Sequence, residues 1–168
     1  MVDRSATWAT EASSGYEEKI LSPGLKINVE LDPATVGGEI EGHLLASLGG
    51  HAAQGDRARF GVIARDEDAR LLGGLIGSTS YGWLLVKMLW VTEAARGCGL
   101  GSRMMEKAED EALSRGCHGA WLDTSSDRAR GFYERLDYEP FGILENMDDE
   151  PPEGHRRFFM RKRLTRQH

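Results

Sequence analysis

The stretch from residue 89 to residue 105 constrains this chain most, because an apolar segment passes through a glycine-rich turn directly into a helical pattern. Gly97, Gly99 and Gly101 alternate in the turn, and a glycine lets the backbone approach a ligand closely because it has no Cβ. The helix that follows begins with unpaired N–H groups and with the positive end of its dipole. The sequence therefore predicts a site for a pyrophosphate-bearing ligand at this turn.

The composition is that of an ordinary globular protein. Its 168 residues are enough for one domain with a substantial core. The net charge of −6 argues against a dedicated nucleic-acid binder and is compatible with a cationic substrate or with solubility alone. Cys98 and Cys117 are too few for a disulfide framework. Without a membrane-spanning run or a signal-peptide pattern, we expect a cytoplasmic protein that does not bind membranes.

Residues 1–24 have no clear period, and we expect an arm that is flexible or binds a partner, ahead of a single domain over residues 25–168. Apolar and polar periodicity predicts helices and strands within that domain. The helices are expected at 34–48, 100–115 and 127–136, and the strands at 25–31, 59–65, 70–78, 83–91, 119–124, 138–144 and 156–164. Hairpins followed by βαβ units predict an α/β fold, a mixed sheet with helices on both faces.

The glycine turn fits neither familiar nucleotide loop. The dinucleotide fingerprint needs a third glycine where Ser102 stands, and a Walker A loop needs a lysine after Gly101. The pattern that fits is Arg/Gln-x-x-Gly-x-Gly/Ala, which begins at Arg96. A strand precedes this pattern, a helix with the sequence ARGFYERLDY lies about one βα unit later, and the strand RFFMRK closes the chain.

Together these features resemble the GNAT superfamily of acetyl-CoA-dependent N-acetyltransferases, over roughly residues 25–164. The resemblance implies a mostly antiparallel mixed sheet of about six to seven strands. It also implies direct transfer of an acetyl group from acetyl-CoA to a primary amine, without a metal. We expect the acceptor to be a small molecule, with a peptide N-terminus or a lysine side chain as alternatives, and we expect a homodimer.

The resemblance also implies roles for individual residues. In this family the glycine turn binds the acyl-CoA pyrophosphate, and the strand before it contributes backbone groups to the pantetheine arm and the acetyl carbonyl. Val91 would polarise that carbonyl, and Tyr133 would act as the general acid that protonates the departing thiolate. The expected donor-binding residues are Leu89, Trp90, Val91, Arg96, Gly97, Cys98, Gly99, Leu100, Gly101, Ser102, Ser126 and Tyr133.

Two positions depart from the family pattern. Ser126 stands where the family often has Asn, and a serine can cap the helix or bond to a pantetheine amide, with a shorter reach. Asp137 stands where the family commonly has Gly, and Asp tolerates the left-handed conformation better than most residues. An alternative role for Tyr133 is that of an aromatic core residue. A rival function for the chain is a non-catalytic acyl-CoA-binding or regulatory module.

No residue stands out as the general base. Asp123 and Glu93 are the nearest carboxylates in sequence, and His43 lies on the first expected helix. A surface salt bridge or a helix cap explains each of these residues better than catalysis does. The remaining alternatives are a base that acts through water, or an amine that arrives neutral.

Overall fold

The computed structural model describes residues 25–48 and 57–165, so the expectations for residues 1–24 and for the loop at 51–56 lie outside the described residues. The chain divides into two units, one ending at Ser47 and the other beginning at Leu48. Helix α1 covers Ala34–Leu48, as predicted. The limits of the proposed single domain over 25–168 stay a prediction.

The strand predicted at residues 25–31 is wrong, because the structure forms no strand there. The apolar side chains of this segment are largely exposed, with Ile27 at 88% and Leu31 at 91%. Alternation of apolar and polar residues shows that a segment suits a half-buried strand, but a strand also needs a partner to take its backbone hydrogen bonds.

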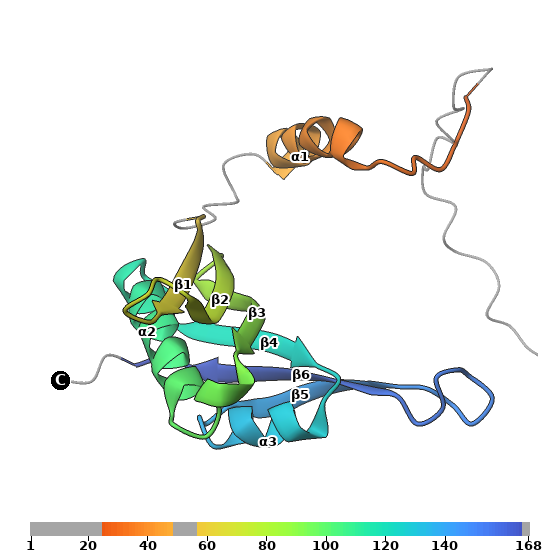
Figure 1. Cartoon of the computed structure of the whole chain (residues 1–168). Helices are drawn as coiled ribbons and strands as arrows, with labels where there is room; N and C mark the ends of the chain where they lie inside the picture. Colours follow the sequence, from red (N-terminus) through yellow and green to blue (C-terminus); the bar gives the residue numbers. More distant parts are fainter. Residues whose placement is uncertain (1–24, 49–56, 166–168) are drawn as a thin grey trace, which may run out of the picture. The chain divides into compact units, whose positions relative to one another are not determined.

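Residues 57–165 contain a six-stranded sheet in the order β1-β2-β3-β4-β6-β5 (Figure 1). Neighbouring strands are antiparallel except β3 and β4, which are parallel. The elements are β1 (Arg59–Arg65), β2 (Leu71–Ser80), β3 (Trp83–Val91), η2 (Glu93–Ala95), α2 (Leu100–Ser114), β4 (Gly119–Thr124), α3 (Asp127–Glu134), β5 (Glu139–Glu145) and β6 (Arg156–Arg163). The sequence did not predict η2, and the bounds of the other elements lie within two residues of the prediction at every end.

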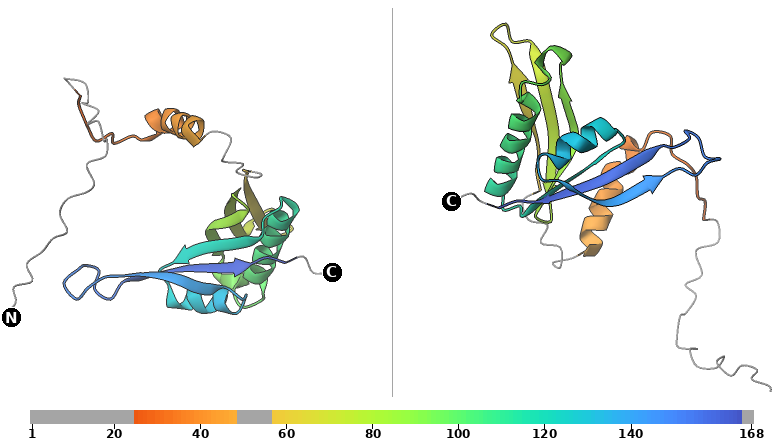
Figure 2. Two further views of the ribbon diagram at one scale, coloured as in Figure 1. Left: turned by 180° about the vertical axis from the view of Figure 1, so that it is seen from behind. Right: turned by 90° about the horizontal axis from the view of Figure 1, so that it is seen from below.

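Helix α2 packs against β1, β2 and β3, and α3 packs against β4, so that both helices cover one face of the sheet. The side chains of α2 that face the sheet are apolar and buried, and they include Met104 and Ala108. They meet sheet residues such as Leu84 and Leu122, which are almost fully buried. The expectation of a helix on the opposite face as well stays a prediction. Figure 2 shows the β5–β6 hairpin extending past the end of β4.

Strand β3 parts from β4 half-way along its length. The two strands pair from Trp83 to Val86, and no pairing between them follows. On the other side, β2 residue Ile76 pairs with Met88 while the next residue pairs with Val86, so Lys87 is the extra residue of a β-bulge. A bulge bends its strand and increases the local twist. The part of β3 after Val86 is therefore separated from β4, and an opening forms between the two strands.

A buried polar cluster joins α2 to β6 and to the residue before β5. The Glu109 carboxylate accepts a hydrogen bond from Lys162 Nζ at 2.7 Å and another from the Tyr138 hydroxyl at 3.0 Å. Burial foremost, and then the charge of Glu109, raise the pKa of Tyr138, which therefore stays protonated as a donor. The cluster fixes α2 against the strands that carry the rest of the site.

Replacing Lys162 with methionine should lower the free energy of unfolding by about 3 kcal/mol, because Glu109 would lose its paired charge in a mostly buried place. Arg161→Met is the matched control. Arg161 is the preceding residue of β6, and its partner Glu139, at 3.1 Å, is exposed, so its loss should cost at most about 1 kcal/mol. Urea unfolding of both variants measures the difference, and equal losses would contradict the role given to the buried cluster.

Candidate active site

The glycine turn adopts the conformation for which the sequence selects glycine. Gly97 has φ +79° and Gly99 has φ +81°, a left-handed region that L side chains rarely adopt. A Cβ at either position would meet nothing within 4 Å, so the space beside the turn is open. Gly99 is the N-cap of α2 and supplies no side-chain hydrogen bond. The first N–H groups of α2 are therefore directed at open space, as anion binding requires.

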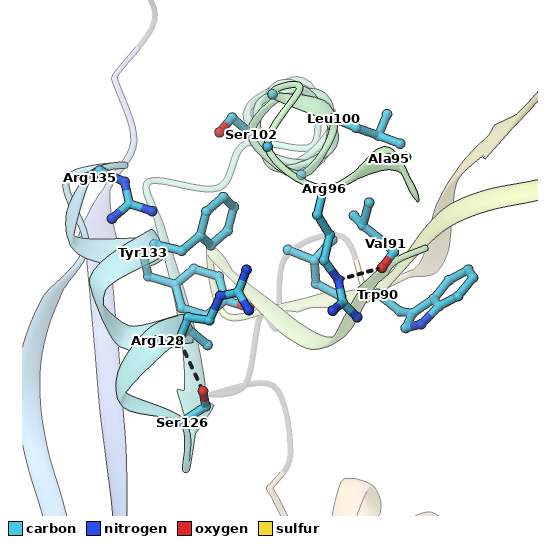
Figure 3. Close-up of a pocket in the computed structure, with 16 residues that line it drawn as sticks. Trp90, Val91, Ala95, Arg96, Leu100, Ser102, Ser126, Arg128, Tyr133 and Arg135 are labelled. Carbon is cyan, nitrogen blue, oxygen red and sulfur yellow. Dashed lines mark hydrogen bonds between the residues drawn. The ribbon is translucent and has the colours of Figure 1, made fainter. Parts of the chain in front are cut away.

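A cavity of about 610 Å³ lies beside this turn, and its walls come from the end of β3, the start of α2 and the inner side of α3 (Figure 3). It is lined by Leu89, Trp90, Val91, Ala95, Arg96, Gly97, Gly99, Leu100, Gly101, Ser102, Ser126, Arg128, Ala129, Phe132, Tyr133 and Arg135. Every predicted donor-binding residue except Cys98 is among them. The Cys98 thiol donates instead to the Ala95 carbonyl at 2.9 Å, and the side chain is exposed.

The backbone of Val91 faces the opening between β3 and β4. The N–H of Thr92 donates to the Leu72 carbonyl of β2 at 2.8 Å, and successive backbone groups of a strand point to opposite sides. The N–H and C=O of Val91 therefore point away from β2. The side chain of Arg96 reaches the same place, where its Nε donates to the Val91 carbonyl at 3.2 Å (Figure 3). A donor N–H at the end of β3 is thus available to a ligand in the cavity.

Tyr133 projects from α3 into the cavity wall and is 8% exposed. Its ring packs edge-on against Phe132, with 5.1 Å between centroids, and is tilted against the ring of Tyr138, with 5.9 Å between centroids. Burial is the larger cause that raises the pKa of Tyr133, and the negative charge of Asp123 adds to it. The phenol is therefore protonated at neutral pH. It can donate a proton to a group in the cavity.

The two departures from the family pattern have local explanations. Ser126 is the N-cap of α3, and its hydroxyl accepts a hydrogen bond from the Ala129 N–H at 3.2 Å. Asp137 has φ +67°, which confirms that the turn after α3 keeps its left-handed conformation with aspartate in place of glycine. Ser126 therefore both starts the helix that carries Tyr133 and lines the cavity.

The sequence did not single out Arg128 or Arg135, which also line the cavity. With Phe132 they follow the i, i+4, i+7 spacing of one helix face, and this spacing was the signal that could have identified them. Together with Arg96 they bring three guanidinium groups to the cavity (Figure 3). That concentration of positive charge favours a ligand that carries several negative charges.

Two of the residues considered as a general base, His43 and Asp123, pair with neighbouring charged side chains. His43 lies 3.8 Å from Glu39 on α1, and both side chains are exposed. Asp123 lies 3.5 Å from Arg157, and Cys117 is a buried core residue. Within residues 25–48 and 57–165, no three His, Cys, Asp or Glu side chains gather into a group that could hold a metal ion. Among the helices that the structure describes, none is long and apolar enough to cross a membrane.

Residues 28–138 match the family described as Acetyltransferase (GNAT) family. The chain therefore belongs to the GNAT acetyltransferases, a family of acyltransferases. The solved structure of an Agrobacterium tumefaciens protein assigned to the acetyltransferases has the same fold, with a TM-score of 0.68 and 30% identity over 84% of this chain and 99% of that one. The prediction of an α/β fold of this family, with a mixed and mostly antiparallel sheet, is confirmed.

Two curated relatives are similar over about half of the chain. Acetyltransferase Atu2258 of Agrobacterium fabrum is 40% identical over 91 residues, 54% of this chain and 66% of that protein. Blasticidin-S acetyltransferase of Streptomyces morookaense is 39% identical over 94 residues, 55% of this chain and 67% of that protein. The chain thus spans about two thirds of the length of these relatives.

The site geometry predicts that Asp123→Asn lowers the pKa of Tyr133, because the variant removes the nearby negative charge. The value should stay above the ordinary 10.0, because burial is the larger cause of the shift and is unchanged. Titration of ¹³C-labelled tyrosine followed by NMR measures this, with the Tyr133 signal assigned from Tyr133→Phe. A pKa of Tyr133 that does not move would show that Asp123 is electrostatically separate from the site.

Proposed function

We propose that this protein is an N-acetyltransferase that moves the acetyl group of acetyl-CoA directly to a primary amine of a small molecule. One observation carries the proposal: a single cavity joins the open glycine turn, the separated end of β3 and the buried hydroxyl-bearing Tyr133. These are the parts needed to bind a pyrophosphate, to orient a thioester and to protonate a leaving thiolate.

The residues present fit acetyl-CoA as the donor substrate. The uncapped start of α2 and the open backbone at Gly97 and Gly99 suit the pyrophosphate. Arg96, Arg128 and Arg135 suit the further negative charge of the nucleotide end. The backbone of β3 beyond Val86, unpaired with β4, suits the amide groups of the pantetheine arm.

The proposed reaction is attack by a neutral amine on the thioester carbonyl. The C–N bond forms as the negative charge collects on the carbonyl oxygen, where the N–H of Val91 can stabilise it. The C–S bond then breaks, and Tyr133 donates its proton to the sulfur. The amine loses its extra proton to solvent or to a base, and the tyrosinate regains one from solvent.

The relatives support a small-molecule acceptor, since one of them is named for acetylation of blasticidin S. A thiol-release assay with acetyl-CoA and a panel of amines tests the proposal. The expected result is CoA release that depends on the amine. Tight CoA binding without turnover on any amine would favour the alternative, a non-catalytic acyl-CoA-binding module, and turnover confined to peptides would favour a protein acetyltransferase.

Gly99→Asp should weaken CoA binding at least about 100-fold, because two like charges about 4 Å apart repel by about 4 kcal/mol at an intermediate effective dielectric. Gly116→Asp is the control for backbone strain. Gly116 has φ +79° and open space beside it, like Gly99, but it lies after the other end of α2. Calorimetry should show wild-type CoA affinity for this control. If Gly99→Asp bound CoA with unchanged affinity, the proposal that the glycine turn binds the pyrophosphate would be contradicted.

Tyr133→Phe should lower kcat about 100-fold or more, the usual contribution of a general acid, and leave CoA affinity nearly unchanged. In the wild-type protein kcat requires the protonated phenol. Because the pKa of Tyr133 is raised, this requirement should be met up to about pH 10 and lost as the pH rises through the shifted value. Steady-state kinetics across alkaline pH measures both effects. An unchanged rate in the variant would assign the proton to another group.

A further inference from the structure

We propose that Asp123 is the acceptor-side carboxylate, which binds the ammonium group of a cationic amine on the face of the sheet opposite α2 and α3. This proposal rests on the proposed acetyl transfer and names its substrate class. It gives Asp123 a role in binding the acceptor, beyond the salt bridge with Arg157.

The register places Asp123 at the opening in the sheet. The parallel ladder between β3 and β4 ends with Val86 opposite Leu122, and Asp123 is the next residue of β4. Leu122 is buried beneath the helices, and successive side chains of a strand point to opposite faces, so Asp123 lies on the other face. The carboxylate is thus beside the point where β3 leaves β4, away from the helices that line the cavity.

Apolar side chains also lie on this face of the sheet. Beyond the bulge, Leu89 and Val91 pack toward the core, so Met88 and Trp90 project to the opposite face, where they are 62% and 48% exposed. Phe159 pairs with Asp123 across β4 and β6, and its ring lies 6.2 Å from that of Phe141. The Phe141 ring already lies under the Arg161 guanidinium, 5.9 Å from its centroid, so the exposed ring of Trp90 is the aromatic group on this face that suits an ammonium group with an apolar substituent.

The carboxylate keeps capacity for a further partner. Arg157 Nε lies 3.5 Å from Asp123 Oδ2, a loose contact between two side chains that are 50% and 38% exposed. An ionised carboxylate has acceptor sites on both oxygens, so this contact leaves room for an ammonium group. After burial, the negative charge of Asp123 also contributes to the raised pKa of Tyr133.

In this proposal acetyl-CoA and the acceptor amine bind on opposite faces of the sheet. Acetyl-CoA fills the cavity on the helix side of the sheet, with its pyrophosphate at the start of α2 and its pantetheine arm along β3. The acceptor must then arrive from the opposite side of the opening, where Asp123 is the carboxylate next to the end of the ladder. A positive charge on the acceptor would bring it to the thioester from that side.

The test measures binding to the protein saturated with CoA, which lacks the acetyl group and allows no turnover. Benzylamine and its neutral isostere benzyl alcohol are titrated in parallel and followed by NMR shifts at low salt. Benzylamine should bind the wild-type protein about fivefold more tightly, as expected for about 1 kcal/mol from a partly exposed ion pair. Asp123→Asn should remove this preference and leave CoA affinity unchanged.

Glu139→Gln is the matched control, since Glu139 also pairs with an arginine of β6 but lies on the edge strand β5. This variant should keep the preference for benzylamine. Equal binding of the two probes by the wild-type protein, or a preference that survives in Asp123→Asn, would overturn the proposal while the acetyl transfer stood. A wild-type protein that does not bind CoA would instead overturn the proposed function itself.

Discussion

The bulge at Lys87 is the feature on which the rest of the site depends. It separates the end of β3 from β4 after four paired positions, so backbone groups that a regular sheet would use internally become available to a ligand. The same bend brings Val91 to the start of the glycine turn, where Arg96 bonds to its carbonyl. A straight β3 would continue the ladder past Leu122 and close the opening between the proposed donor and acceptor sides.

The opening is useful only if its two walls are rigid, and different forces fix each wall. Helix α2 is held by a buried apolar stripe and by the Glu109 cluster, which links it to β6 and to Tyr138. Ser126 starts helix α3, and the chain turns at the left-handed Asp137 after it, so the ten residues between them place Tyr133 at a defined depth. No side chain packs beside Gly97 or Gly99 in the glycine turn, and this leaves space for a ligand.

Local chemistry made much of this predictable from the sequence. The turn, the helix after it and the strand ends follow from glycine, periodicity and capping residues, and the residues predicted to bind the acetyl donor, other than Cys98, line one cavity. Three features could not be predicted from the sequence, because they depend on tertiary context. Residues 25–31 alternate like a strand but have no partner strand, the bulge at Lys87 is defined only by the register with β2, and Arg128 and Arg135 gain meaning only when α3 faces the turn.

The central claim is that the glycine turn and the separated end of β3 form one donor site. A crystal structure of this protein with CoA tests it most directly. The account predicts the pyrophosphate on the N–H groups between Gly97 and Ser102, the pantetheine arm along Leu89 to Val91, and the sulfur within hydrogen-bonding distance of the Tyr133 hydroxyl. CoA bound at another surface, or with its sulfur far from Tyr133, would contradict the account.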